Sequence, residues 1–354
     1  MVVFILHISN RFVIGVRVPK REAERVRRRL ASEGILLKDY APLRDGDYVI
    51  FPVSRCPDDL ECVEHEFPLR RRKPRSLEDA LLEFLSPEEV QHVTKSFDII
   101  GHVAVIRIPD ELWDKRKEIG EAILRVHPNV RTVAAEVGPH QGVFRVQPVE
   151  IIAGEPNLVT EYHEFGVRLR LEVGKTYFSP RLSYERYRIA KQVRPGEFIA
   201  ALFAGVGPFP LVIHRFQPNI RAYAVELNPD AYKFLVENIR LNRSEGKIEP
   251  ILGDVRDVVP ERYPHKADRV LMPSPILAED FLDVALTAAK PTGAVIHTYA
   301  LGPNDDPFTE KEYELLRFFR DQGWAAKILN KRVVRSYSPR LDQISFDVFV
   351  KKME

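Results

Sequence analysis

A glycine-containing turn and two acidic residues in the C-terminal half of the chain have the types and spacing of a nucleoside-binding site. The turn reads FAGVGPF at residues 203–209, where Gly205 and Gly207 allow a tight bend and let a ligand lie against the backbone. Glu226 follows about twenty residues later, where a carboxylate can accept both hydroxyls of a ribose. Asp254 ends the next expected strand, and its carboxylate could accept a hydrogen bond from an adenine amino group.

The turn lacks one feature of a dinucleotide site. A pyrophosphate-binding fingerprint has a third glycine, whereas Pro208 follows Gly207 in this chain. A nucleoside cofactor without a pyrophosphate therefore fits better, and we expect S-adenosylmethionine. The residues expected to contact it are Phe203, Ala204, Gly205, Val206, Gly207, Glu226, Leu227, Asp254, Val255, Pro273 and Pro275. The alternative is a fold of the same type that holds no cofactor.

Strands and helices alternate from residue 176 onward, and this alternation would bring the candidate residues together. The expected strands are 198–205, 221–229, 248–254, 267–275 and 293–301, and the expected helices are 230–242, 279–290 and 309–323. Such alternation is typical of a doubly wound parallel sheet, whose ligands bind beyond the carboxyl ends of the strands. Two last strands, 325–337 and 343–351, have no helix between them, so we expect an antiparallel hairpin at that edge.

Two smaller α+β domains are expected before the α/β domain. We divide the chain into a small α+β domain with a basic linker at 1–70, a middle α+β domain with an antiparallel sheet at 71–175, and the doubly wound domain at 176–354. Residues 56–75 turn polar and basic and are expected to be linker. The run of Arg70, Arg71, Arg72, Lys73 and Arg75 could contact phosphates or could simply be solvated. The segment TYFSP at 176–180 is expected to be strand-like.

Composition excludes some classes of protein. The 354 residues are 45% apolar, and no apolar run approaches the ~18 residues of a membrane span, which excludes an integral membrane protein. The 53 Lys and Arg residues nearly balance the 51 Asp and Glu residues, so net charge does not mark a nucleic-acid binder. Cys56 and Cys62 cannot form a disulfide scaffold and match no strong metal motif. We expect a lone disulfide or inert thiols, no metal and a cytoplasmic location.

Several motifs together resemble one enzyme family. They are YFSPRLSYERYRI at 177–189, FAGVGPF, ELNPDAYKFLVENIRLN at 226–242, GDVRDV, ADRVLMPSP, AVIHTYA, VRSYSPR at 334–340 and, in the middle domain, SFDIIGHVAVIRIP at 96–109. The chain resembles the archaeal and eukaryotic tRNA guanosine-37 N1-methyltransferase family from about residue 75 to its end. The first 55 residues are similar in size and pattern to that family's N-terminal tRNA-binding domain. The resemblance implies a class I methyltransferase domain, S-adenosylmethionine as donor, the tRNA anticodon loop as substrate and a monomer.

The resemblance also carries over four residues by motif match, namely Arg145, Tyr177, Glu185 and Arg186. Guanine N1 carries a proton at neutral pH, and a nearby carboxylate can take it, a role we assign to Glu185. Negative charge then grows toward O6, and we assign Arg145 to hold it. Arg186 does not share a helix face with Glu185 and is expected to orient a phosphate or the loop, while Tyr177 is a candidate wall for cofactor or base. Alternatively, Glu185 is a carboxylate that favours the start of a helix, and Arg145 a surface arginine.

The chain departs from the family pattern at the end of the fourth strand. The family usually has Asn-Leu-Pro there, and this chain has Pro273, Ser274 and Pro275. Since proline has no side-chain donor or acceptor, the pocket could be more permissive and could also accept the tricyclic base 4-demethylwyosine for methylation at C7. Ala201 replaces a usual acidic residue. The alternatives are transfer of the aminocarboxypropyl arm of the same donor, a non-catalytic RNA-binding protein, and a methyltransferase for ribosomal RNA or protein.

Overall fold

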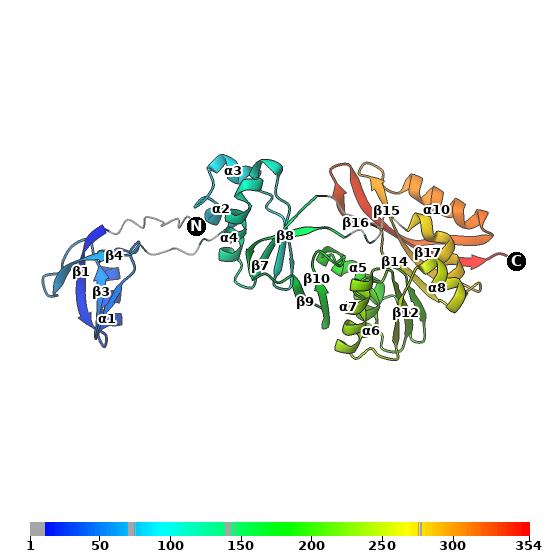
Figure 1. Cartoon of the computed structure of the whole chain (residues 1–354), viewed down its shortest axis with the longest axis horizontal. Helices are drawn as coiled ribbons and strands as arrows, with labels where there is room; N and C mark the ends of the chain where they lie inside the picture. The colour runs from blue at the N-terminus through cyan, green and yellow to red at the C-terminus, as the bar shows by residue number, and fades with distance from the viewer. Residues whose placement is uncertain are drawn as a thin grey trace. The chain divides into compact units, whose positions relative to one another are not determined.

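The structure is a computed structural model that describes residues 11–69, 74, 76–138, 142, 144, 146–274, 276 and 278–354 (Figure 1). The chain divides into two compact units, Met1–Pro74 and Arg75–Glu354, and each is described by itself. The linker arginines and lysine at 70–73 and 75 lie outside the described residues. Within the described part of the chain, no helix is both long and apolar enough to cross a membrane.

In its described residues, 11–69 and 74, the N-terminal unit is a four-stranded antiparallel sheet with one helix. Its elements are β1 (Arg11–Pro19), α1 (Ala23–Ser32), β2 (Leu43–Asp45), β3 (Tyr48–Pro52) and β4 (Cys62–Phe67), with strand order β2-β3-β1-β4. Helix α1 packs Val26 and Leu30 against Val16, Val18 and Phe51 of the sheet. The prediction that residues 56–75 are linker is wrong for β4, which pairs with β1 and buries Phe67 completely.

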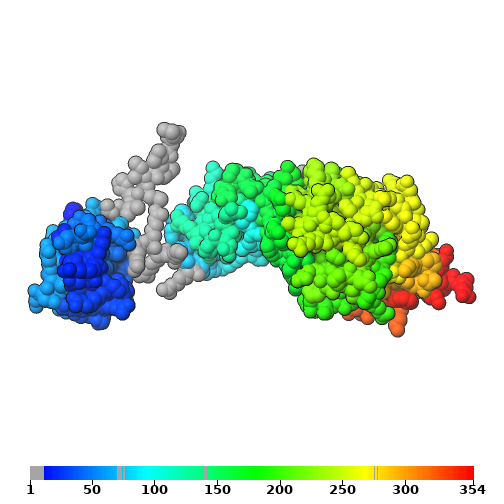
Figure 2. Space-filling model, turned by 90° about the horizontal axis from the view of Figure 1, so that it is seen from below, coloured from blue at the N-terminus to red at the C-terminus, as the bar shows by residue number. Residues whose placement is uncertain are grey.

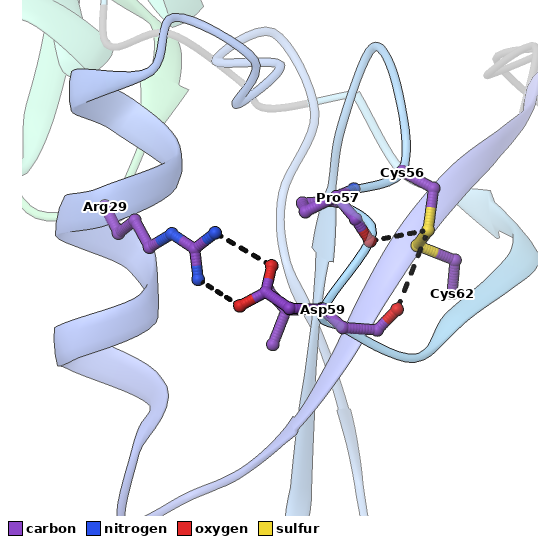
Figure 3. The surroundings of a disulfide bond; sticks show 6 residues. Arg29, Cys56, Pro57, Asp59 and Cys62 are labelled. Carbon is purple, nitrogen blue, oxygen red and sulfur yellow. Dashed lines mark hydrogen bonds and ion pairs between the residues drawn. A yellow bond between two sulfur atoms is a disulfide. The ribbon is translucent and has the colours of Figure 1, made fainter.

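Cys56 and Cys62 form a disulfide at the start of β4 (Figure 3). Between them, Asp59 accepts two hydrogen bonds from the Arg29 guanidinium of α1, with nitrogen–oxygen distances of 2.5 and 2.8 Å. The loop is thus fixed both to itself and to the helix. Of the two expected states of the cysteines, the structure shows the lone disulfide.

The second unit begins with a mixed α/β segment. Its elements are α2 (Leu77–Leu81), α3 (Pro87–His92), β5 (Asp98–Ile100), β6 (Val103–Ile106), η1 (Asp110–Lys115), α4 (Arg116–Val126), β7 (Thr132–Glu136) and β8 (Val149–Gly154). The sheet order is β5-β6-β7-β8, and β6 and β7 are parallel because η1 and α4 cross over between them. The expectation of an antiparallel middle sheet is therefore wrong for this pair, whereas β5 with β6 and β7 with β8 are antiparallel. A hairpin of β9 (Val159–Glu164) and β10 (Val167–Glu172) follows.

The expected doubly wound sheet forms the rest of this unit. Its elements are η2 (Pro180–Leu182), α5 (Ser183–Ala190), β11 (Phe198–Ala201), α6 (Pro208–Phe216), β12 (Arg221–Glu226), α7 (Pro229–Leu241), β13 (Ile248–Leu252), α8 (Val255–Arg262), β14 (Arg269–Met272), η3 (Glu279–Phe281), α9 (Leu282–Ala288), β15 (Ala294–Pro303), α10 (Thr309–Asp321), β16 (Trp324–Ser338) and β17 (Leu341–Lys352). The strand order is β13-β12-β11-β14-β15-β17-β16. Strands β11 to β15 are parallel, and β17 pairs antiparallel with β15 and with β16, as the missing helix predicts.

Apolar side chains cover both faces of this sheet. One core contains residues of α8, α9 and α10, and the other contains residues of α5, α6 and α7. A third apolar cluster joins the middle segment to the doubly wound part, since Ile100 and Val103 share it with Val206. The middle and doubly wound segments accordingly adjoin in Figure 2. Residues 177–179 are irregular rather than strand-like, so that prediction is wrong for them.

Candidate active site

The glycine turn after β11 and the end of β12 meet at the carboxyl edge of the sheet. The backbone N–H of Gly205 donates to Glu226 Oε2 at 2.7 Å, and the N–H of Asn228 donates to Glu226 Oε1 at 2.8 Å. Burial raises the pKa of Glu226 above its ordinary value, although the surrounding backbone N–H groups act in the opposite direction. The Glu226 carboxylate thus holds the turn in place through backbone N–H groups on both of its oxygens.

The two glycines of the turn serve different purposes. Gly205 has φ +56°, and a Cβ added there would meet only the carbonyl oxygen of Tyr177, at 3.7 Å. Gly207 has φ +89° and precedes α6, and a Cβ added there would lie 2.6 Å from Leu235 Cδ1. Gly205 therefore leaves room beside the turn for a ligand, whereas Gly207 is required for the packing of α6 against α7.

Several other predicted cofactor residues have buried side chains. Ala204, Val206 and Val255 are all buried, and the carbonyl of Val206 accepts a hydrogen bond from Asn238 at 2.9 Å. Only their remaining backbone groups could contact a ligand. Leu227 is 41% exposed and is therefore open to contact through its side chain.

The remaining predicted cofactor residues lie at three other places on this edge. Phe203 has φ +56° and packs edge-to-face on Phe281. Asp254 caps α8 by accepting the N–H of Arg256 at 2.8 Å, a structural use that the sequence prediction missed. Pro273 follows β14 and is partly buried, and Pro275 lies outside the described residues.

An irregular segment connects the glycine turn to helix α5. Its Lys175 carbonyl accepts a hydrogen bond from the Asn228 side chain at 2.8 Å, and the Tyr177 carbonyl lies beside Gly205. The Tyr177 side chain is 45% exposed. Arg181 forms an ion pair at 2.8 Å with Asp98 of β5, which fixes the end of the segment to the middle sheet. Helix α5 therefore starts at a defined distance from the turn.

Glu185 lies in the first turn of α5, and only 2% of its surface is exposed. Arg188 donates to both of its carboxylate oxygens at 3.0 to 3.2 Å, and the Tyr299 hydroxyl of β15 donates to Oε2 at 3.2 Å. Arg332 of β16 lies 3.3 Å from Oε1 and rests on the ring of Tyr184. Arg332, 31% exposed, is the most accessible of these three partners.

Arg186 faces away from Glu185 into a different buried cluster. Its guanidinium donates to Glu164 Oε1 at 2.5 Å and to Glu164 Oε2 at 2.7 Å, and also to the Ser179 carbonyl at 3.2 Å. Its side chain is 1% exposed. These contacts bury the Arg186 guanidinium against Glu164 and the segment before α5. The expectation that Arg186 orients a phosphate or the loop stays a prediction.

Arg145 lies outside the described residues. Glu136 and Gln147, on either side of it in the sequence, line a cavity of about 160 Å³ together with Tyr177 and Arg335. The structure also reveals partners of Glu185 that sequence reasoning did not assign to it. The spacing of three residues from Glu185 to Arg188 on a helix was a readable signal. Tyr299 and Arg332 lie far away in the sequence and gave no such signal.

Three protein-family models match the chain. The tRNA methyltransferase 5 N-terminal domain matches residues 15–61, the TYW2 N-terminal domain matches 77–157, and the TRM5/TYW2 methyltransferase domain matches 160–322. The tRNA (guanine(37)-N(1))-methyltransferase Trm5b of Pyrococcus abyssi is 39% identical over 338 residues, which cover 94% of this chain and 98% of that protein. The chain belongs to the TRM5/TYW2 methyltransferase family. The resemblance and the fold class expected from the sequence are thereby confirmed.

Other members of the TRM5/TYW2 family are also similar. The tRNA 4-demethylwyosine(37)-methyltransferase Taw21 of Saccharolobus solfataricus is 30% identical over 263 residues, covering 74% of this chain and 96% of that protein. The solved complex of aTrm5 with tRNALeu has a TM-score of 0.71 and 32% identity, covering 96% of this chain and 100% of that one. The solved complex of Pyrococcus horikoshii TYW2 with MeSAdo has a TM-score of 0.66 and 31% identity, covering 79% and 100%.

Proposed function

We propose that this chain is a tRNA methyltransferase that transfers a methyl group from S-adenosylmethionine to N1 of guanosine 37 in the anticodon loop. The curated Pyrococcus abyssi relative carries the name of this activity and aligns over nearly the whole chain. A solved relative that covers almost the whole chain contains tRNA. The structural observation that carries the proposal is the buried Glu185 carboxylate. It lies on α5, and the segment that leads into α5 passes beside the glycine turn at Gly205.

The glycine turn fits a nucleoside cofactor. Space is open beside Gly205, and the Glu226 carboxylate can accept ribose hydroxyls while it still holds the turn. The exposed Leu227 side chain and the backbone at Val255 and Pro273 would line the same edge. The bound cofactor supplies an electrophilic methyl group on a positively charged sulfur.

Glu185 acts as the base in this proposal. Guanine N1 is a poor nucleophile while it carries its proton, and a carboxylate within hydrogen-bond reach accepts that proton as N1 attacks. The bond from N1 to the methyl carbon forms as the carbon–sulfur bond breaks. The electron pair of the carbon–sulfur bond stays on sulfur. Because Tyr299 and Arg188 hold the carboxylate from the protein side, its orientation costs nothing at the moment of reaction.

Two arginines have separate roles in this proposal, one at the negative charge on guanine O6 and one at the segment before α5. Arg145 would stabilise the negative charge that grows on O6. Arg186 would hold the segment before α5 in place through Glu164 and the Ser179 carbonyl, as a positioning residue. The exposed Tyr177 ring would form a wall for cofactor or base. A base in an anticodon loop can be turned out of its stack at modest cost.

A second activity, methylation of 4-demethylwyosine at C7, is favoured by one sequence feature and one relative. Pro273 stands where the family usually has Asn, and the similar Taw21 protein is named a tRNA 4-demethylwyosine(37)-methyltransferase. We expect Pro273→Asn to shift methylation toward guanosine and away from the tricyclic base. Assays of both tRNA forms with labelled donor would measure the ratio, and an unchanged ratio would count against the second activity.

We also propose that the protein acts as a monomer in the cytoplasm. One chain carries the two N-terminal domains and the methyltransferase domain that the family models describe. No second chain is needed to supply Glu185 or the glycine turn.

Product analysis tests the main proposal. The purified protein is incubated with methyl-labelled S-adenosylmethionine and with tRNA transcripts that carry guanosine or adenosine at position 37. We expect one methyl group on guanosine 37, detected as N1-methylguanosine after digestion, and none on the adenosine transcript. A product with the larger aminocarboxypropyl mass, or no product at all with both RNAs bound, would contradict the proposal and favour one of the alternatives.

A further inference from the structure

Arg188 divides its guanidinium between two buried carboxylates. Its Nε and Nη2 donate to Glu185, and its Nη1 and Nη2 donate to Asp347 of β17, with 3.0 Å between Nη2 and Oδ1. Asp347 is 1% exposed and also accepts a hydrogen bond from Gln192 at 3.0 Å. Because the five N–H donors of a guanidinium lie in one rigid plane, the Asp347 contact fixes the plane from which Arg188 reaches Glu185.

A neutral histidine supports Asp347 from the other side. Arg269 can only donate, and its Nη1 lies 2.6 Å from His297 Nε2, so Nε2 accepts and the ring proton is on Nδ1. Nδ1 then donates to Asp347 Oδ1 at 2.6 Å. Burial lowers the pKa of His297, in keeping with a neutral ring. Burial alone would raise the pKa of Asp347, but its contacts with His297 and Arg188 outweigh this and hold it well below its ordinary value.

These groups form a continuous series across α5, β15, β17 and β14. We call Glu185, Arg188, Asp347, His297, Arg269 and Glu197 the buried ion-pair chain. Its charged members form ion pairs, the neutral His297 links Asp347 to Arg269 by hydrogen bonds, and a 2.7 Å contact from Arg269 to Glu197 ends it. Buried ion pairs are weak evidence for stability, because apolar residues of similar volume often do as well or better in their place. A gain in stability therefore does not by itself account for so many buried charges.

We propose that Asp347 and Arg188 are positioning residues of the methyl-transfer reaction. Asp347 fixes the guanidinium of Arg188, and Arg188 fixes the direction in which Glu185 presents its carboxylate to the purine. The inference rests on the proposed role of Glu185 as the base. Neither Arg188 nor Asp347 needs to touch the substrate, since both act through Glu185.

A double-mutant cycle tests this inference in the full-length protein. The single-turnover rate of methyl transfer to a guanosine-37 tRNA transcript is measured for Asp347→Asn, Glu185→Gln and the double variant. We expect Asp347→Asn to lower the single-turnover rate about tenfold in the wild-type protein and less than about twofold in Glu185→Gln. The second effect is smaller because Asp347 acts through the Glu185 carboxylate, which Glu185→Gln lacks. Cofactor affinity measured by calorimetry should stay unchanged in every variant.

The control is Ser345→Ala. Ser345 lies on β17 two residues from Asp347, is fully buried, and has a hydroxyl with no hydrogen-bond partner among the described residues. It should retain the wild-type rate, which separates damage to the strand from loss of positioning. If Asp347→Asn does not fold, Arg188→Gln takes its place in the same cycle.

The outcomes distinguish this inference from the function on which it rests. Equal slowing of both backgrounds by Asp347→Asn, with Glu185→Gln itself slow, would overturn the positioning role alone. A fully active Glu185→Gln would overturn the role of Glu185 and this inference together. Strong slowing by Ser345→Ala would show that the strand, rather than the ion-pair chain, controls the rate.

Discussion

At the scale of single residues, two carboxylates, Glu226 and Glu185, each combine a structural contact with a proposed functional role. Glu226 holds the glycine turn through two backbone N–H groups and is also the candidate ribose acceptor. Glu185 is the candidate base and also a member of the buried ion-pair chain. In both cases the protein contacts engage both oxygens of the carboxylate and so fix its orientation.

Gly205→Ala should weaken cofactor binding about tenfold or more while the protein still folds. A Cβ there would occupy the open side of the turn, and the left-handed backbone adds about 1–2 kcal/mol of strain. Calorimetric titration with S-adenosylmethionine measures the affinity, and the melting temperature reports the fold. Gly207→Ala is the comparison, because its Cβ would meet Leu235 and should mainly lower stability. Wild-type affinity in Gly205→Ala would exclude the turn as the binding site.

Contacts between the ends of neighbouring parallel strands could be predicted from the sequence. Contacts between segments far apart in the chain could not. Gly205 and Glu226 follow neighbouring parallel strands, so their meeting could be predicted from the rule that such strands end at one edge. Asp347 reaches Arg188 across 159 positions of sequence, and no pattern within either segment reports that contact. The capping role of Asp254 was readable in principle, because Asp is a favoured residue at the start of a helix.

At the scale of elements, period and length decided which predictions succeeded. The alternation of strands and helices after residue 176 predicted the doubly wound sheet, and the missing last helix predicted the β16–β17 hairpin. Strand β4 was missed because Cys62–Phe67 carries several polar residues and exposes three in succession, so it shows no alternation of apolar and polar residues. The parallel β6–β7 pair was missed although a helix of eleven residues separates the strands.

The buried ion-pair chain links the stability of its elements to pH. The pKa of buried His297 is lowered in the folded protein, so the neutral form is favoured and its protonation opposes folding. The stability that neutral His297 contributes is therefore fully present above the pKa of an unfolded histidine, about 6.5, and is lost as the pH falls below that value. We expect the melting temperature to fall between about pH 7 and about pH 5, and His297→Asn to show a smaller fall. An equal slope in both proteins would contradict this assignment.

At the scale of the whole molecule, two compact units carry separate cores. The unit Arg75–Glu354 contains the glycine turn and Glu185, and the unit Met1–Pro74 has its own sheet and disulfide. Residues 15–61 are similar to the tRNA methyltransferase 5 N-terminal domain, which is consistent with the sequence-based expectation that the first unit contacts tRNA. The division of the second unit at residue 175 stays a prediction.

Removal of residues 1–74 should weaken tRNA binding about tenfold or more without changing the affinity for S-adenosylmethionine. Phosphate contacts release counterions, so the affinity of the full chain should also depend more steeply on salt than that of the shortened chain. Filter binding at several salt concentrations measures both quantities. Equal tRNA affinity and equal salt dependence of the two proteins would remove the first unit from the tRNA interface.

The measurement that tests the account most directly is the single-turnover rate of Glu185→Gln on guanosine-37 tRNA. The amide keeps the size of the side chain but cannot accept the N1 proton as a carboxylate does. We predict a loss of about a hundredfold or more, in the range that general-base removal produces, with cofactor and tRNA affinities close to those of the unaltered protein. A variant that binds both partners and transfers the methyl group at the original rate would contradict the assignment of Glu185 as the base.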